Sequence, residues 1–182
     1  MVRVQRVRGA ILTAIALTGV SATAQSVSAP GLKAAYLFNF AQFVEWPADA
    51  VPTGSPLAVC IVNDGAVASA LEQTVKGRTV VGHALTVVRL APVATLPTCH
   101  VIYFGGSDQK YSVDLLETLN GRLVLTVSDA PRFARSGGMV ELFLEGGRMR
   151  IAVNTDALQR GKVRLSSRVL QLATIVKDVP SQ

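Results

Sequence analysis

The sequence predicts an α/β fold: a single three-layer domain with a mostly parallel central sheet flanked by helices and a C-terminal antiparallel hairpin. Two observations predict it. Short apolar runs alternate with amphipathic helical patterns between residues 57 and 127, which is typical of parallel sheets covered on both faces. Farther along the chain, two strand patterns flank Gly146-Gly147, a pair that favours a two-residue hairpin turn.

The first 24 residues are predicted to be a secretory signal peptide. Residues 1–8 carry three arginines and no acid, residues 10–20 are largely apolar, and Ala22-Thr23-Ala24 offers the small residues that a signal peptidase needs. A retained anchor is the alternative, but it requires about 18 to 20 apolar residues. We therefore expect a periplasmic mature protein, residues 25–182, that does not insert into the membrane.

The mature chain is long enough to bury the core of one domain. Removing 24 of the 182 residues leaves 158, and three arginines leave with the leader, so that 15 basic and 12 acidic residues remain, a net charge of +3. Lysines and arginines are scattered singly and do not cluster with aromatic residues. This pattern argues against nucleic-acid binding.

Export would place the two cysteines, Cys60 and Cys99, in an oxidising compartment, where an even number of cysteines favours disulfides. One pairing is possible. A bridge that closes a loop of about 40 residues would stabilise the fold by about 4 kcal/mol on the chain-entropy model. Two separately buried thiols are the alternative.

The first element predicted in the mature chain is a helix over residues 33–46. It follows a linker at residues 26–30 and ends before Pro47, because the residue that precedes a proline disfavours the helical region. At about 100° per residue, its apolar side chains cover half of the helix, enough to pack on a sheet. They are Phe43, Tyr36, Phe40, Val44, Leu37, Ala41 and Ala34.

Five of the ten aromatic residues of the chain lie between residues 36 and 46, and two of them, Phe38 and Trp46, fall on the polar side of this helix. One interpretation places all five in the core. The other predicts that these two contact a partner protein, with Gln42 and Glu45 as a polar rim. Aromatic residues inside a polar rim are typical of interface hot spots.

The segment that follows predicts four strands and two helices. The strands are expected at 57–62, 86–90, 100–104 and 122–127, and the helices at 66–75, capped by Asn63 or Asp64, and from a cap at Ser107 or Asp108 to Leu119. The first of these strands is a continuous apolar run, which is typical of a strand buried on both faces.

The antiparallel hairpin is expected at residues 139–145 and 148–154. Its register gives six side chains one inward face, where Leu144 faces Met149, Leu142 faces Ile151 and Val140 faces Val153, and it pairs Glu145 with Arg148 and Phe143 with Arg150 on the outer face. Phe143 and Arg150 are a weaker candidate for partner contact. A cation–π pair between them is the alternative.

The C-terminal segment predicts two more helices. The first is short, at residues 155–159, and is closed by Gly161. Ser166 is expected to cap the second, an amphipathic helix whose apolar residues are Val169, Leu170, Leu172 and Ala173.

A search for catalytic residues finds no complete set. The chain has two histidines, His83 in a turn and His100 at the start of a strand, and single histidines of this kind are more often structural residues than ligands. Cys99 and His100 do not form a thiol dyad, because successive strand residues point to opposite faces. The motifs of common hydrolases, metalloproteases, thiol oxidoreductases and dinucleotide-binding proteins are absent. We expect no enzyme activity, no catalytic residue, no cofactor and no metal site.

Gly105, Gly106 and Ser107 are a weak candidate for a ligand site. They lie between a predicted strand and a predicted helix, where free backbone amides can hold an anion. A tight turn followed by a helix cap is the alternative.

Three sequence blocks resemble the YfiR family of periplasmic repressors. They are residues 33–47, with the motif KAAYLFNFAQFVEWP, residues 137–154, and residues 163–173. Together they cover essentially the whole mature chain in the order expected for the family, and the first block is the most specific.

This resemblance implies a periplasmic regulatory protein that inhibits a membrane-bound diguanylate cyclase by binding its periplasmic sensor region, and so lowers cyclic-di-GMP and biofilm output. It also implies an α/β fold, a homodimer, and a disulfide between neighbouring strands at Cys60 and Cys99. Some members carry a second cysteine pair near the late hairpin, which this chain lacks, so redox control through a second bridge is not implied. Two other function classes stay open, a small-ligand-binding or sensory protein and a hydrolase.

Overall fold

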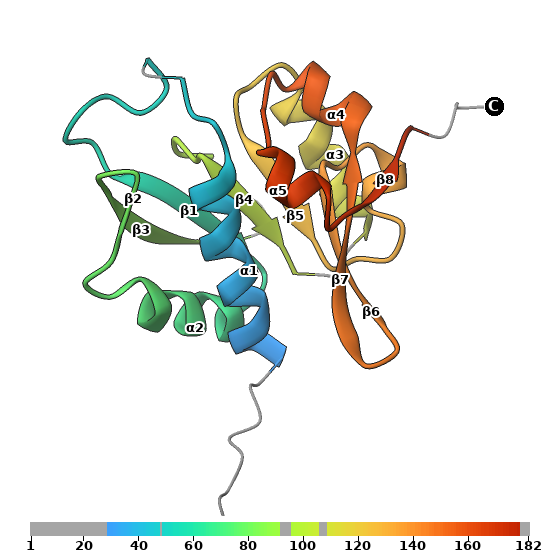
Figure 1. The fold of residues 1–182 in the computed structure, drawn as a ribbon, viewed down its shortest axis with the longest axis horizontal. Helices are drawn as coiled ribbons and strands as arrows, with labels where there is room; N and C mark the ends of the chain where they lie inside the picture. The colour runs from blue at the N-terminus through green and yellow to red at the C-terminus, as the bar shows by residue number, and fades with distance from the viewer. Residues whose placement is uncertain (1–28, 48, 92–95, 106–108, 179–182) are drawn as a thin grey trace, which may run out of the picture.

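A computed structural model describes residues 29–47, 49–91, 96–105 and 109–178 (Figure 1). Within these ranges the elements are α1 (Ala29–Phe43), β1 (Leu57–Val62), α2 (Gly65–Val75), β2 (Thr79–Val80), β3 (His83–Leu90), β4 (Val101–Phe104), α3 (Gln109–Leu119), β5 (Leu125–Ser128), η1 (Ala134–Ser136), β6 (Val140–Glu145), β7 (Arg148–Asn154), α4 (Thr155–Arg160), α5 (Ser167–Leu170) and β8 (Thr174–Val176). The expected signal peptide, and Gly106 and Ser107 of the expected ligand turn, lie outside the described residues.

The described strands form one curled sheet in the order β2-β3-β1-β4-β5-β6-β7-β8. Its centre is parallel, from β3 through β1, β4 and β5 to β6. β2 joins one edge antiparallel to β3, β6 and β7 form the antiparallel hairpin in the predicted register, and β8 pairs parallel with β7. The predicted fold class is confirmed.

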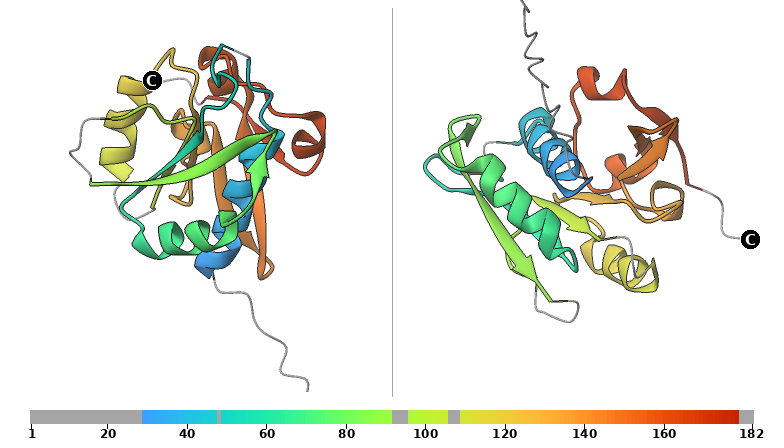
Figure 2. Two further views of the ribbon diagram at one scale, coloured as in Figure 1. Left: turned by 90° about the vertical axis from the view of Figure 1, so that its left-hand side faces the viewer. Right: turned by 90° about the horizontal axis from the view of Figure 1, so that it is seen from below.

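Alternate side chains of the central strands build two cores, because successive strand residues point to opposite faces. Val59 and Tyr103 belong to the core under α1 and α2. Cys60 and Phe104 belong to the core under α3, on the other face of the sheet. Figure 2 (right) shows α1 and α2 on one side of these strands and α3 on the other. The disulfide between Cys60 and Cys99, whose Cα atoms are 5.8 Å apart, lies in the second core.

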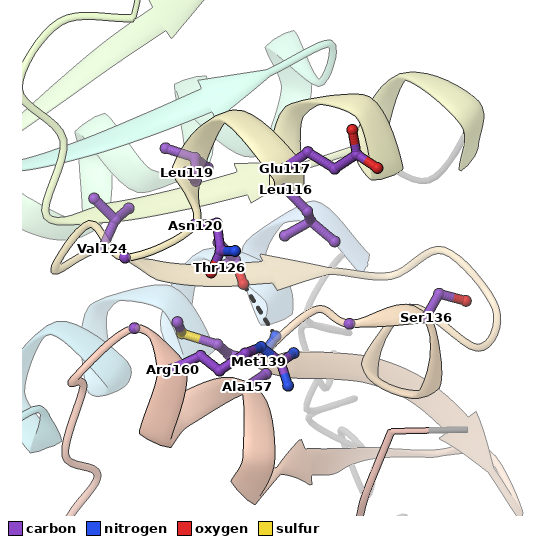
Figure 3. Close-up of a pocket in the computed structure, with 13 residues that line it drawn as sticks. Leu116, Glu117, Leu119, Asn120, Val124, Thr126, Ser136, Met139, Ala157 and Arg160 are labelled. Atoms are coloured by element: carbon purple, nitrogen blue, oxygen red, sulfur yellow. Dashed lines mark hydrogen bonds between the residues drawn. The ribbon is translucent and has the colours of Figure 1, made fainter. Parts of the chain in front are cut away.

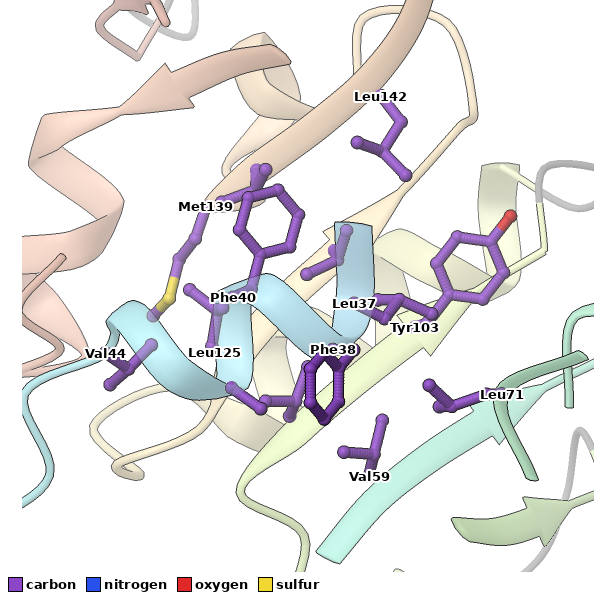
Figure 4. Close-up of a cluster of buried hydrophobic side chains, with 14 of the residues drawn as sticks. Leu37, Phe38, Phe40, Val44, Val59, Leu71, Tyr103, Leu125, Met139 and Leu142 are labelled. Carbon is purple, nitrogen blue, oxygen red and sulfur yellow. The ribbon is translucent and has the colours of Figure 1, made fainter. Parts of the chain in front are cut away.

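α1 lies inside the curl of the sheet and is covered on more than one side (Figure 4). Leu37 and Phe40 are almost fully buried, and Phe38, expected on the solvent side, is only 8% exposed. The expectation of an exposed Phe38 is therefore wrong. A helix that packs on one sheet face has one buried stripe, whereas α1 packs against α2 as well as against the sheet, and a helix covered on several sides is apolar over most of its surface.

The ends of α1 differ from the prediction of residues 33–46. The helix begins at Ala29 and ends at Phe43, before Pro47 can act on it. Val44 instead forms an isolated antiparallel bridge with Leu165, and the Glu45 amide donates to the carbonyl of Arg164 at 2.9 Å. Pairing with a distant segment thus ends the helix early and leaves the following residues, Trp46 included, outside it.

Two other predicted boundaries are corrected. β3 begins at His83, not Thr86, because a two-residue turn at Val81-Gly82 pairs it with β2 in a hairpin that was not predicted. β5 begins at Leu125, not Arg122, because the chain turns after α3 and the Val124 amide donates to the carbonyl of Arg122.

The expected last helix is much shorter than its apolar pattern predicted. α5 has four residues, and the side chain of Ser166 makes no capping hydrogen bond. The chain then enters β8, because Thr174 and the residues after it pair with β7. Leu172, expected on the buried face, is 78% exposed. In the hairpin, Leu144 also leaves the expected inward face and is 70% exposed, because the tip of the hairpin extends beyond the core.

Candidate partner-binding groove

A groove of about 330 Å³ lies at the amino ends of β1 and β3. Three segments form it: the chain after α1, the loop at residues 49–56 that leads into β1, here called the groove loop, and the β2–β3 turn. The lining residues are Val44, Glu45, Trp46, Pro47, Val51, Thr53, Val81 and His83. Most of them are apolar, and Glu45 lies at the exposed rim.

Trp46 is fixed in this groove by contacts at two points of its indole ring. The ring N–H donates to the carbonyl of Ala41 at 3.1 Å, and the ring meets that of His100 edge to face, with centroids 5.7 Å apart and planes at 86°. The side chain stays partly exposed. An anchored aromatic ring with a solvent-facing edge loses little conformational entropy when a partner covers it.

Val81 is the most unusual residue of the groove. It is 72% exposed, and its φ is +50°, with +83° at the following Gly82. Such a turn favours asparagine or glycine, because positive φ values strain a β-branched side chain. An exposed apolar residue held in a strained conformation suggests a functional constraint. Val81 was not among the predicted site residues, and the Val81-Gly82 pair is the one signal that the sequence offers for this turn.

The groove loop is held from the inside by His100, whose side chain is 8% exposed. The Ala58 amide donates to Nδ1 of His100 at 2.9 Å, and Nε2 lies 3.2 Å from the carbonyl oxygen of Ala50. A carbonyl oxygen only accepts, so Nε2 carries the proton and Nδ1 is unprotonated. The geometry therefore fixes the neutral ring in one tautomer.

His83 holds the other end of the same loop. Its Nδ1 lies 2.8 Å from the carbonyl oxygen of Ser55, so this nitrogen donates. Both histidines of the chain thus bind backbone carbonyls of the groove loop. This agrees with the prediction that each is a structural residue.

The other predicted partner-contact residues are only partly brought together. Gln42 is exposed on the last turn of α1. Phe38 lies in the core, with the Arg78 guanidinium 5.5 Å from the centre of its ring. Phe143 packs against a separate small core, and Arg150 pairs with Glu145 at 3.4 Å. None of these four residues lines the groove.

The expected ligand turn after β4 is closely packed at Gly105. Its amide donates to the Val62 carbonyl at 2.9 Å and so is not free for an anion. A Cβ atom at Gly105 would lie 2.9 Å from Cβ of Asp64. Lys33 bridges the same end of the sheet, with Nζ 2.5 Å from Asp129 and 3.8 Å from Asp64.

Tyr103 is buried beside these charges. Burial, and then the neighbouring Asp129 carboxylate, raise the pKa of Tyr103 well above its ordinary value. Its hydroxyl makes no hydrogen bond with any other described residue. The acidic groups here disfavour an anionic ligand, and the described residues contain no group of three histidine, cysteine or acidic side chains that could hold a metal ion.

A second cavity, of about 230 Å³, lies between α3, β5 and α4 (Figure 3). Two of its polar side chains are already engaged: Thr126 Oγ1 accepts the Met139 amide at 3.0 Å, and Arg160 pairs with Asp178. The cavity nevertheless offers an apolar wall, formed in part by Leu116. The cavity is therefore a candidate position for a small ligand.

In the part of the chain that the structure describes, no helix is both long enough and apolar enough to span a bilayer. The family model of YfiR/HmsC-like proteins matches residues 30–174, which covers all three of the sequence blocks that showed the resemblance. Proteins of this family are periplasmic and regulatory, and they act in diguanylate cyclase signalling without catalysing a reaction. The chain therefore belongs to the YfiR/HmsC-like family.

Proposed function

We propose that the chain binds the periplasmic sensor region of an inner-membrane diguanylate cyclase and inhibits the enzyme, and that the Trp46 groove makes this contact. Inhibition lowers cyclic-di-GMP and biofilm output. One observation carries the proposal. An exposed and strained Val81 lies beside an anchored Trp46, in a chain whose family regulates such enzymes.

The chemistry of the groove supports a protein partner. A central aromatic anchor, a neighbouring aliphatic side chain and a polar rim are the features that concentrate binding energy in protein interfaces. Trp46, Val81 and Glu45 supply these three features. The volume of the groove fits one or two partner side chains, such as an aliphatic residue that packs on the indole edge.

We propose further that the chain is exported, that the leader at residues 1–24 is cleaved, and that the mature protein of residues 25–182 is a homodimer. The disulfide between Cys60 and Cys99 supports export, because such bonds persist in oxidising compartments. N-terminal sequencing of the periplasmic form tests the cleavage site, and sedimentation of the mature protein tests the dimer.

The main test is a pull-down from solubilised inner membrane with the tagged mature protein. We expect wild type to retain a diguanylate cyclase, and Trp46→Ala to lose it while the melting temperature changes little. Leu144→Asn is the control, because it removes an exposed apolar side chain that lies on the hairpin tip, outside the groove. Loss of binding in the control but not in Trp46→Ala would move the interface to the hairpin.

The second cavity favours one other candidate function, the binding of a small periplasmic ligand between α3 and α4. A thermal-shift screen of periplasmic metabolites tests it. Stabilisation that disappears in Ala157→Phe, which fills the cavity, would support this function. A screen without any stabilising compound would leave the protein-binding proposal as the better one.

A further inference from the structure

A group of exposed basic side chains lies next to the groove. Residues 160–168 hold four basic residues and no acidic one. Arg160 is already engaged in an ion pair. Lys162, Arg164 and Arg168 are exposed, and none of the ion pairs between described residues involves them. These three residues are here called the basic strip.

Backbone pairing fixes the basic strip beside the groove. Val44, which lines the groove, forms the isolated bridge with Leu165, and the carbonyl of Arg164 accepts the Glu45 amide at 2.9 Å. Val44 and Leu165 are buried, so the exposed side chains of Glu45 and Arg164 lie on the opposite, solvent side of the paired segments. Glu45 is the one acidic residue of the groove lining, and Asp49 of the groove loop is exposed as well. The bases of the strip outnumber these acids.

Lys162 takes its place in the strip in an unusual conformation. Its φ is +54°, and it follows Gly161, the C-terminal cap of α4. Glycine or asparagine adopts such a left-handed conformation with less strain than lysine. An exposed base held there without an ion pair suggests a function for its charge. A favourable interaction with the C-terminal end of α4 is the alternative.

We propose that the basic strip steers an acidic segment of the partner onto the groove, where an apolar side chain of that segment packs on Trp46 and Val81. This inference rests on the proposed function, because it describes the surface that the sensor region presents. Exposed charges at the edge of an interface chiefly raise the association rate. The strip thus selects the surface that approaches the groove, and Trp46 determines how long the complex lasts.

The same charges would attract an anionic membrane surface, but the shape of the groove favours a protein. Peripheral membrane binding requires apolar side chains that reach into the lipid. Trp46 lies in a groove, is only partly exposed, and is held by its hydrogen bond to the Ala41 carbonyl. A partner side chain can enter the groove, whereas a bilayer would have to pull the indole out of it.

The test measures association and dissociation rates of the mature protein on the immobilised cyclase from the pull-down, at low and at high salt. Arg164→Gln should slow association about two- to fivefold at low salt and leave dissociation unchanged. Neutralising all three strip residues should slow association about tenfold, and high salt should remove the difference. Trp46→Ala should instead speed dissociation. Arg148→Gln, which removes an exposed base on the hairpin tip, changes the net charge as much as Arg164→Gln does and should have no effect.

An acidic partner predicts opposite effects for opposite charges. Glu45→Gln should speed association, because it removes a charge that repels the partner, whereas Arg164→Gln slows it. Changes in the same direction would contradict an acidic partner. Lys162→Asn should slow association while the melting temperature stays at or above that of wild type, since asparagine fits the left-handed conformation. A lower melting temperature with unchanged association would mean that Lys162 serves only α4.

The other outcomes separate this inference from the proposed function. Cyclase binding that responds neither to salt nor to the strip variants would overturn the strip and leave the proposed function standing. Unchanged cyclase kinetics, together with binding to phosphatidylglycerol but not phosphatidylcholine vesicles that the triple variant loses, would assign the strip to the membrane.

If no cyclase is retained, the proposed function fails, and a glutamate-rich peptide with one leucine becomes the probe. Trp46 is the only tryptophan of the chain, so its fluorescence reports binding in the groove. We then expect the emission to change with this peptide at low salt, and not with a lysine-rich peptide of the same length or in the triple variant. An equal response to both peptides, or to neither, would refute the strip as well.

Discussion

At the carboxyl end of the parallel strands, Lys33 joins Asp64 and Asp129, and Gly105 packs against the turn before α2. At the amino end, Trp46 and Val81 are partly open to solvent and rest on a loop held by two histidines. Ligands of α/β proteins usually bind at the carboxyl end. Here ion pairs and tight contacts fill the part of that end around Lys33 and Gly105, and the opposite end carries the groove.

This difference predicts a separation between residues that hold the fold and residues that bind. Substitutions at the carboxyl end, or in the core beneath it, should lower stability and leave binding unchanged in the molecules that fold. Substitutions in the groove should weaken binding with little loss of stability. Four groups of variants test the separation, in order of decreasing effect.

Phe40→Ala should lower the free energy of unfolding by about 3 to 5 kcal/mol, because it empties a site in the core that surrounds α1. Phe38→Ala should behave like Phe40→Ala, since its side chain is also buried, and Trp46→Ala should cost less than either. Urea unfolding followed by circular dichroism measures all three. Equal losses would mean that Trp46 is a core residue, and the two ends would no longer differ.

Lys33→Met should cost about 2 kcal/mol, because it leaves Asp64 and Asp129 facing each other without a cation. This value is reduced from that of a fully buried pair, since the three side chains are 18% to 22% exposed. The pull-down with Lys33→Met should still retain the cyclase. Unchanged stability in urea would show that solvent screens this cluster.

Val81→Asn should stabilise the protein by about 1 kcal/mol, because asparagine tolerates the left-handed conformation that strains valine. The melting temperature should rise by about 2 to 4 °C, while partner binding weakens. Leu144→Asn removes a similar apolar side chain without strain and should change neither quantity. A Val81→Asn variant that binds normally would refute a role for Val81 in the groove.

Asp178 should contribute to acid unfolding and not to partner binding. The hydrogen bond from Arg160, followed by that from Asn154, lowers the pKa of Asp178. A carboxyl group with a lowered folded-state pKa stabilises the fold above its unfolded pKa, about 3.9, and loses that contribution as the pH falls below it. Melting temperatures should therefore fall less steeply below about pH 4 in Asp178→Asn, with partner binding at neutral pH unchanged. Loss of partner binding in Asp178→Asn would link this ion pair to the groove.

Local patterns predicted most of the sheet. The apolar run of Leu57–Val62 predicted the residues of β1 correctly, because a strand buried on both faces is apolar along its whole length. The Gly146-Gly147 pair predicted the register of the hairpin correctly, because a two-residue turn determines which residues of the two strands pair. The end of α1 could not be predicted, since it depends on the pairing of Val44 with Leu165, far away in the sequence.

The site was predicted less well than the fold. Trp46 was found as an aromatic residue in a polar surrounding, but Phe38 was misplaced because a helical wheel assumes one covered face. Val81 contradicts the turn chemistry on which sequence reasoning depends. The contacts of His100 with Ala58 and Ala50 join residues 42 and 50 positions apart, and no local pattern encodes them.

The tight contact at Gly105 has an evolutionary consequence. Even one added carbon would come within 3.0 Å of both the Asp64 side chain and the Asn63 carbonyl, so this position should be glycine in every relative that keeps the sheet. The groove loop and the turn at Val81 carry no such constraint on the core. On the proposed function, lineages whose partner diverged could therefore change these two segments to match it while inheriting the same scaffold.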